Sequence, residues 1–189
     1  AAFQQLLPDL HAQAVVLARD HLDLAPGVAV LDLYCGIGST LRQWVLAGAS
    51  AFGVELAGGA VDCARINAPG AVVLRGTCEQ RLPQARAWWH DGNHSRHVCY
   101  VNPPRSGLEP ALLDALARDL RPDRIAYLSC SAGTLARDLA VFETAGYIVS
   151  SIAPFDFFPG THHVECLALL TLVRLLDAGE PAFDDGRLP

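Results

Sequence analysis

Cys130 occupies a position in the sequence that suits a nucleophile. It follows an apolar run, in the segment Leu128-Ser129-Cys130-Ser131, and comes just before a helical pattern. The open N–H groups of a helix N-terminus stabilise a thiolate, which is the reactive form of cysteine. We expect Ser131 or Thr134 to cap this helix. A structural thiol, buried as a small apolar side chain, is the alternative for Cys130.

Glu165 is the candidate for proton transfer. It opens the apolar run 165–172 and comes after the aromatic segment Phe155-Asp156-Phe157-Phe158. Shielding by these rings would raise the pKa of its carboxyl group, which suits a general base. An acid at a strand end that faces water is the alternative. Of the adjacent His162 and His163, we expect at most one to face the site, because neighbours in a strand point to opposite faces.

Asn102 ends another apolar run and is followed by Pro103-Pro104-Arg105. The two prolines stiffen the backbone and hold Asn102 at the edge of the predicted sheet. An Asn amide can bond to the edge or the exocyclic group of a base. Arg105 either binds a phosphate or braces a local carboxylate. A proline-rich loop without a ligand is the alternative.

The segment 30–39 contains the pattern Asp-x-x-x-Gly-x-Gly, at Asp32, Gly36 and Gly38. It predicts a strand, a glycine turn and a helix N-terminus, which favour an electron-rich ligand. Glu55 lies 19 residues after Gly36, near the spacing of an acid that binds ribose hydroxyls. A leucine replaces the third glycine of the dinucleotide pattern, so S-adenosylmethionine, which has a ribose but no phosphate, fits better. A glycine turn without a ligand is the alternative.

The elements that must position these residues alternate along the chain. Apolar runs predict strands at 28–33, 51–54, 71–74, 97–101, 124–128, 147–153 and 165–172, and helical patterns lie at 10–22, 40–47, 58–67, 79–89, 108–120 and 134–145. This alternation predicts an α/β fold: a mostly parallel, seven-stranded sheet with helices on both faces. The last two strands have no helix between them and predict a terminal antiparallel hairpin. The candidate residues then gather at the carboxyl ends of the strands.

Composition limits the possible function classes. The chain has 189 residues, of which 51% are hydrophobic, and a formal net charge of -6. We expect one domain over residues 1–176 and a mobile tail over 177–189. The acidic balance opposes nucleic-acid binding by bulk electrostatics alone. There is no run of 18 apolar residues, so we expect no membrane span.

Cysteine usage indicates a reducing cytoplasm. The six cysteines form no Cys-x-x-Cys pair, so we expect neither a metal site nor disulfides. The chain lacks Met and Lys, and the missing Met indicates a piece of a longer polypeptide.

Four motifs in this order resemble the RNA uridine C5-methyltransferases, which depend on S-adenosylmethionine and form 5-methyluridine in tRNA and rRNA. The resemblance runs from Phe3 to about Leu170 and covers the catalytic domain of that family. The motifs are Leu31-Asp32-Leu33-Tyr34-Cys35-Gly36-Ile37-Gly38, Pro103-Pro104-Arg105-Ser106-Gly107-Leu108, Leu128-Ser129-Cys130 with Thr134-Leu135-Ala136-Arg137-Asp138-Leu139, and Phe155-Asp156-Phe157-Phe158-Pro159 with Thr161-His162-His163-Val164-Glu165.

The resemblance implies a Rossmann-like class I methyltransferase fold and specific roles for residues. Cys130 falls on the nucleophile and Glu165 on the general base. The positions that fall on cofactor contacts are Gln4, Asp32, Tyr34, Gly36, Gly38, Ser39, Glu55 and Asn102; we assign Asn102 and Arg105 to the substrate as well. The implied partner is structured RNA, bound with the help of an RNA-binding domain that this chain lacks.

The sequence departs from the family pattern at Asn102, at Ser131-Ala132 and at Leu6, where the family has Asn; the first two departures leave two alternatives open. The family usually has Asp at the position of Asn102, and Asn-Pro at Ser131-Ala132. Asn-Pro-Pro is also similar to the motif of amino-group methyltransferases that act on adenine or guanine. One alternative is therefore an amino-group methyltransferase, and the other is a protein that binds S-adenosylmethionine without catalysis.

Overall fold

A computed structural model describes residues 8–161 and 164–173 of the chain. It contains seven strands, whose bounds are β1 (Val28–Leu33), β2 (Ser50–Glu55), β3 (Val72–Arg75), β4 (Arg96–Val101), β5 (Arg124–Ser129), β6 (Tyr147–Phe155) and β7 (Glu165–Leu172). The helices are α1 (Pro8–Leu22), α2 (Ser39–Leu46), α3 (Gly58–Asn67), α4 (Cys78–Asp91), α5 (Pro110–Asp114) with its π-helical continuation η1 (Ala115–Leu120), and α6 (Ala132–Thr144).

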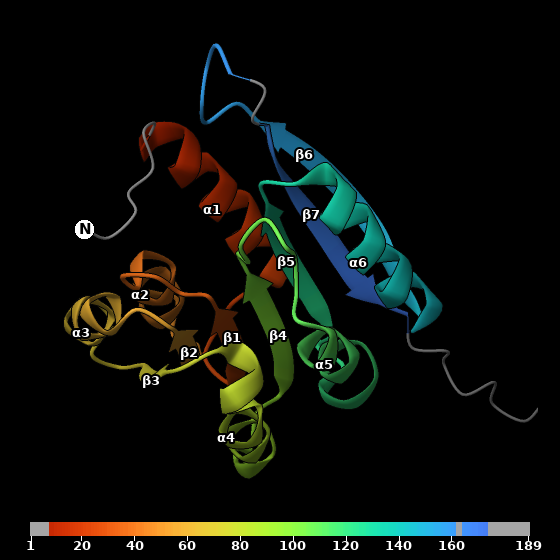
Figure 1. Ribbon diagram of the computed structural model, residues 1–189. Helices are drawn as coiled ribbons and strands as arrows, with labels where there is room; N and C mark the ends of the chain where they lie inside the picture. Colours follow the sequence, from red (N-terminus) through yellow and green to blue (C-terminus); the bar gives the residue numbers. More distant parts are fainter. Residues whose placement is uncertain (1–7, 162–163, 174–189) are drawn as a thin grey trace, which may run out of the picture.

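The strands form one sheet in the order β3-β2-β1-β4-β5-β7-β6. The neighbours from β3 to β5 are parallel, whereas β7 runs antiparallel to both β5 and β6. The last strand of the chain is thus inserted between β5 and β6, next to the parallel part (Figure 1). The predicted mostly parallel sheet and its terminal hairpin are confirmed.

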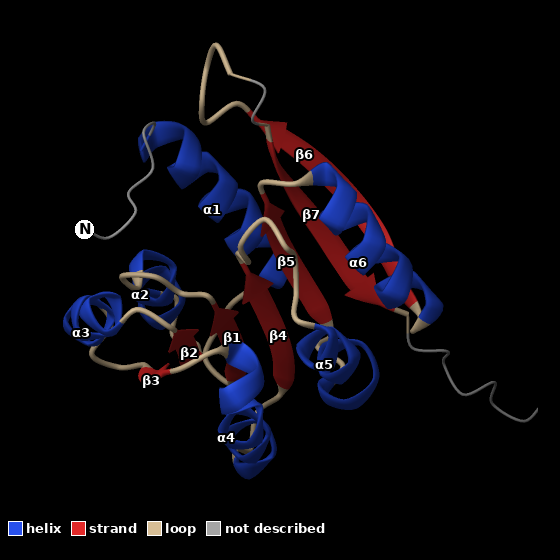
Figure 2. Cartoon of the chain, in the orientation of Figure 1, coloured by secondary structure: helices blue, strands red, loops and turns tan. Residues whose placement is uncertain are grey.

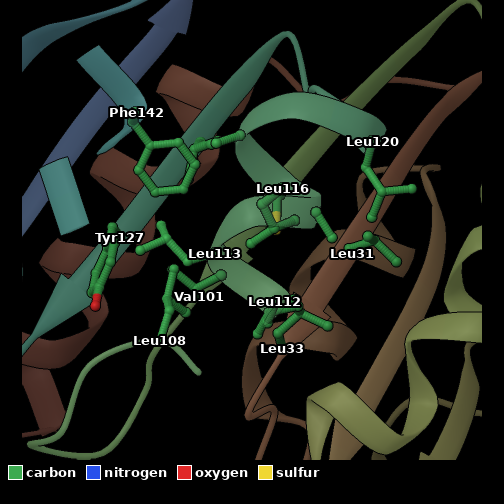
Figure 3. Packing of buried hydrophobic residues seen from close by; sticks show 14 of the residues in the cluster. Leu31, Leu33, Val101, Leu108, Leu112, Leu113, Leu116, Leu120, Tyr127 and Phe142 are labelled. Carbon is green, nitrogen blue, oxygen red and sulfur yellow. The ribbon is translucent and has the colours of Figure 1, made fainter. Parts of the chain in front are cut away.

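Helices cover both faces of the sheet (Figure 2). One core cluster packs residues of α1, α2 and α3 against the sheet, and the other packs residues of α4, α5, η1 and α6. Figure 3 shows part of the second cluster, where leucines of α5 and η1 meet β1, β4 and β5. The central strand β1 is buried along its whole length, which explains why its sequence is continuously apolar apart from Asp32.

The helix predicted over 108–120 differs from the structure in two ways. It begins at Pro110, with Glu109 as its N-cap residue, and its second half is π-helical. It ends at Arg121, which has a left-handed φ of 45°. The π-helical half buries Ala115, Leu116, Ala117 and Leu120 in the core, so tertiary packing rather than helix propensity sets its geometry.

Several predictions lie outside the described residues. They are the loop at 1–7 with Gln4, the orientation of His162 and His163, and the tail at 177–189. Within the described part of the chain, no helix has the length and apolarity needed to cross a membrane.

Candidate active site

Cys130 and Glu165 adjoin the last paired residues of β5 and β7, at one end of the sheet. In the antiparallel pair β5–β7, the last paired residues are Ser129 and Cys166. Cys130 is the next residue after Ser129, and Glu165 is the next one before Cys166. If the register continued by one residue, they would lie opposite each other, where side chains share a face of an antiparallel sheet.

Glu165 lies in an apolar environment. It is 5% exposed and pairs with Phe155 across β6–β7. The rings of Phe155 and Phe157 stack with their centroids 5.5 Å apart. Burial raises the pKa of the Glu165 carboxyl group, because a low dielectric disfavours its charged form. Of the predicted shielding rings, Phe155 is thus paired with Glu165, while the role of base stays a prediction.

Hydrogen bonds fix the turn that carries Cys130. The backbone N–H of Ser131 donates to Ser129 Oγ at 3.2 Å, and Ser129 Oγ donates to the Ser131 carbonyl oxygen at 3.1 Å. Ser131 is the N-cap residue of α6, but its side chain makes no cap hydrogen bond. Thr134 Oγ1 donates to the Ser131 carbonyl instead, so the predicted side-chain cap is wrong. Cys130 itself is partly exposed.

The glycine turn after β1 has an open side and a packed side. Gly36 has a φ of 55°, and a Cβ added there would meet nothing within 4 Å. Gly38 has a φ of 78°, and its Cβ would lie 2.8 Å from Ala64 Cα. Gly38 therefore allows α3 to pack closely, and Gly36 leaves free space at the carboxyl ends of the strands. Their contacts with a cofactor stay predictions.

Glu55 is held at the end of β2 by the backbone of two loops. Its Oε2 accepts a hydrogen bond from the Gly36 N–H at 3.0 Å, and its Oε1 accepts one from the Ala57 N–H at 2.8 Å. Each carboxylate oxygen keeps further acceptor capacity. Glu55 is thus positioned beside the glycine turn with lone pairs available to a ribose.

Asp32 is fully buried beneath this turn. Its Oδ2 accepts from Trp44 Nε1 at 2.7 Å, while Oδ1 has no hydrogen-bond partner among the described residues. Burial raises the pKa of Asp32 to about 7, and hydrogen bonds from Thr40 and Trp44 partly oppose this shift. The pKa of the neighbouring Tyr100 is raised, first by burial and then by the charges of Asp32 and Glu165. The charges of both carboxylates therefore act on the Tyr100 hydroxyl.

Tyr34 is hydrogen-bonded through its hydroxyl to Glu109. Its φ is 63°, and its hydroxyl donates to Glu109 Oε2 at 3.3 Å. Glu109 Oε2 also accepts from the Glu79 N–H at 3.2 Å, so it joins the end of β1 to the start of α4. Burial raises the pKa of the Tyr34 hydroxyl. No local signal in the sequence identified Glu109 as this bridge, because its partners lie 30 and 75 residues away.

The other predicted residues surround the same edge. Asn102 follows β4, and its N–H donates to the Leu33 carbonyl oxygen at 3.3 Å. Ser39 opens α2 and lines a groove of about 220 Å³ between α1 and α2, together with His11. Arg105 lies in the exposed loop after Asn102, where its carbonyl oxygen accepts from Thr134 Oγ1 at 3.1 Å.

These features fit a nucleoside-like ligand. A buried acceptor without a partner (Asp32 Oδ1), the free space at Gly36 and the fixed Glu55 carboxylate lie around one turn. This is the place where open α/β sheets bind such ligands. No three His, Cys, Asp or Glu side chains gather as metal ligands in residues 8–161 and 164–173.

The sheet order and the glycine turn define a Rossmann-like fold, which the chain shares with solved S-adenosylmethionine-dependent methyltransferases. Precorrin-6y C5,15-methyltransferase from Geobacter metallireducens shares the fold at 16% identity, with a TM-score of 0.65 over 90% of this chain and 93% of that chain. The tRNA (uracil-54, C5)-methyltransferase of Pyrococcus abyssi, solved in complex with S-adenosyl-L-homocysteine, is 29% identical, with a TM-score of 0.68 over 90% of this chain and 40% of that chain.

Residues 91–173 match the family model of the tRNA (uracil-5-)-methyltransferases. The matched segment includes Asn102, Arg105, Cys130 and Glu165. An uncharacterized RNA methyltransferase of Halalkalibacterium halodurans is 34% identical over 176 residues, which cover 90% of this chain and 37% of the relative. An uncharacterized RNA methyltransferase of Bacillus cereus is 35% identical over 177 residues, which cover 91% of this chain and 38% of the relative. The chain thus spans less than two fifths of these curated relatives.

Proposed function

We propose that this chain transfers a methyl group from S-adenosylmethionine to C5 of a uridine in tRNA or rRNA. The observation that supports the proposal is the β5–β7 register, whose last pair, Ser129 and Cys166, adjoins Cys130 and Glu165. The family match over residues 91–173 supports uracil C5 as the target. Structured RNA is the proposed partner, and the longer relatives support a contribution from further domains to RNA binding.

S-adenosylmethionine would be held by Asp32, Glu55 and the turn at Gly36, and it supplies an electrophilic methyl group. C5 of uracil is a weak nucleophile. Cys130 adds as a thiolate to C6 and forms a C6–S bond, which raises electron density at C5. After C5 has been methylated, Glu165 takes the C5 proton; the electron pair reforms the C5–C6 double bond, and the thiolate of Cys130 leaves. A base inside a duplex is out of reach, so the target lies in a loop or is flipped out.

Trapping the covalent intermediate tests this proposal. The full-length protein is incubated with RNA that contains 5-fluorouridine and with S-adenosylmethionine, and adducts are separated on a denaturing gel. The carbon–fluorine bond gives Glu165 no proton to remove, so the Cys130 adduct should accumulate and should be absent in Cys130→Ala. Methylated natural RNA without an adduct would instead indicate the amino-group reaction through Asn102. Cofactor binding with neither outcome would indicate a protein without catalysis.

A further inference from the structure

Asp138 on α6 is a fully buried carboxylate that none of the proposed steps uses. Its Oδ2 accepts from the Leu108 N–H at 2.9 Å and from the Tyr127 hydroxyl at 2.7 Å. Its Oδ1 accepts from Arg137 Nε at 2.8 Å. A buried charge is costly unless it is paired and hydrogen-bonded, and here a guanidinium and two further donors satisfy it. Figure 3 shows Tyr127 and Leu108 in one packed cluster.

These contacts fasten the loop after β4 to α6. Arg137 Nη2 donates to the Ser106 carbonyl oxygen at 3.0 Å, and Thr134 Oγ1 donates to the Arg105 carbonyl oxygen at 3.1 Å. Together with the Leu108 N–H, three residues of the loop are bonded to one helix or to its buried carboxylate. We call the Asp138, Arg137 and Tyr127 side chains, with the loop 105–108, the α6 clamp.

Gly107 lies in the middle of the α6 clamp and is required by it. Its φ is 78°, a left-handed conformation that other residues rarely adopt. A Cβ at Gly107 would lie 2.6 Å from Arg137 Nη2 and 2.7 Å from Asp138 Oδ2. The loop backbone therefore approaches the ion pair more closely than any side chain would allow.

The clamp connects the two halves of the candidate site. Tyr127 lies three residues before Cys130 on β5, and α6 begins two residues after Cys130. Thr134 also donates to the Ser131 carbonyl oxygen in the Cys130 turn. On the other side, the fastened loop continues directly from Asn102. The clamp thus sets the position of the nucleophile turn relative to the loop assigned to cofactor and substrate.

We propose that Asp138, Arg137 and Tyr127 are positioning residues that hold the Cys130 turn and the Asn102–Arg105 loop in register for attack on the uracil ring. This inference rests on the proposed function. Reacting groups must be held within small tolerances, and a displacement of about 1 Å costs on the order of a hundredfold in rate. The clamp should therefore affect the covalent step more than binding of either substrate.

The test uses Tyr127→Phe and Arg137→Lys in the full-length protein, with Tyr147→Phe as the matched control. Tyr147 is also a buried tyrosine of the same core cluster, and its hydroxyl donates to the Pro122 carbonyl oxygen at 2.9 Å, at the other end of the sheet. The rate of adduct formation on saturating 5-fluorouridine RNA is measured together with the Kd for RNA and for S-adenosylhomocysteine. Both clamp variants should form the adduct at least about tenfold more slowly, with both Kd values within about twofold and the control unchanged.

Three outcomes would overturn the inference. Equal adduct rates in the clamp variants and the control would refute the positioning role alone. The adduct rate could also fall only in proportion to the fraction of unfolded protein, measured by thermal unfolding of the same samples. The clamp would then have a structural role only. Absence of any adduct in the wild type would contradict the proposed function, and this inference with it. The wild-type lane of the gel distinguishes this outcome from failure of the positioning role alone.

Discussion

The position of Glu165 at the start of β7 raises the pKa of its carboxyl group. It is the first residue of β7, and its antiparallel neighbours place it opposite Phe155 on one side and next to the Cys130 turn on the other. Burial raises its pKa, so it holds a proton more tightly than a solvated glutamate at the same pH. A base of this kind is active only above its raised pKa, and the reaction should slow as the pH falls through that value.

Replacing Glu165 with Gln should separate the covalent step from product release. The amide cannot take the C5 proton, so turnover should fall by at least about a hundredfold. Cys130 is unchanged, so unmodified RNA should accumulate as a methylated covalent adduct visible on a denaturing gel. The double variant Cys130→Ala, Glu165→Gln serves as the control without adduct. Near-normal turnover of Glu165→Gln would exclude this residue as the base.

Asp32 gives a prediction for stability. Its folded pKa of about 7 lies above the ordinary value of 3.8, so between these values the folded state binds a proton that the unfolded state releases. Its contribution to stability is therefore complete below pH 3.8 and is lost as the pH rises toward 7. Asn at this position keeps an acceptor for Trp44 Nε1 but does not titrate. From pH 5 to pH 8 the wild type should lose roughly 2–3 kcal/mol relative to Asp32→Asn, measured by urea unfolding. If the free energies of unfolding of the wild type and Asp32→Asn changed equally with pH, the raised pKa of Asp32 would be contradicted.

At the scale of elements, the sequence predicted what local patterns determine. The bounds of β1 and α3 agree with the predicted 28–33 and 58–67 because apolar runs and glycines mark both ends. The π-helical turn of η1 was not predicted, since the same apolar spacing also fits an α-helix. The bridging role of Glu109 and the α6 clamp were also missed, because their partners are distant in sequence.

Substitutions of Gly36 and Gly38 in the glycine turn test ligand binding and packing separately. Gly36→Ala puts a methyl group into open space at a φ of 55°, so it should cost only about 1–2 kcal/mol of stability. The same methyl group occupies the proposed ligand space, and the affinity for S-adenosylhomocysteine should fall by about tenfold or more, or 1.4 kcal/mol. Gly38→Ala meets the backbone of α3 and should cost about 2–5 kcal/mol.

Thermal unfolding and titration calorimetry on the two alanine variants check this contrast. Gly38→Ala should have the lower melting temperature, and at a temperature where both are folded Gly36→Ala should have the weaker affinity. The reverse ranking would mean that the open side of the turn at Gly36 is not the ligand side.

At the scale of the whole molecule, the site depends on strand order more than on any motif. Cys130 and Glu165 are 35 residues apart, and the strand ends next to them are neighbours only because β7 lies between β5 and β6 rather than at the edge. Strand spacing in the sequence predicts a hairpin of the last two strands but does not specify which of them pairs with β5. The pairing of β5 with β7 therefore required the three-dimensional structure, and the convergence of the two residues stays a prediction.

The charge of the whole chain leads to a prediction about RNA. A net charge of -6 on 189 residues opposes the approach of a polyanion, because affinity for nucleic acid comes largely from neutralised phosphates. The proposed cofactor site, in contrast, uses residues at one edge of the sheet. The 189-residue chain alone should therefore bind S-adenosylhomocysteine measurably, yet bind tRNA only with a Kd above about 10 μM at 150 mM salt.

Fluorescence anisotropy with labelled tRNA at several salt concentrations, beside calorimetry with S-adenosylhomocysteine, measures both affinities on one preparation. The shallow salt dependence expected from few phosphate contacts would assign most of the RNA affinity to parts that the longer relatives have and this chain does not. Submicromolar binding with a steep salt dependence would show the opposite: that arginines of this chain form a local basic surface strong enough to overcome its net charge.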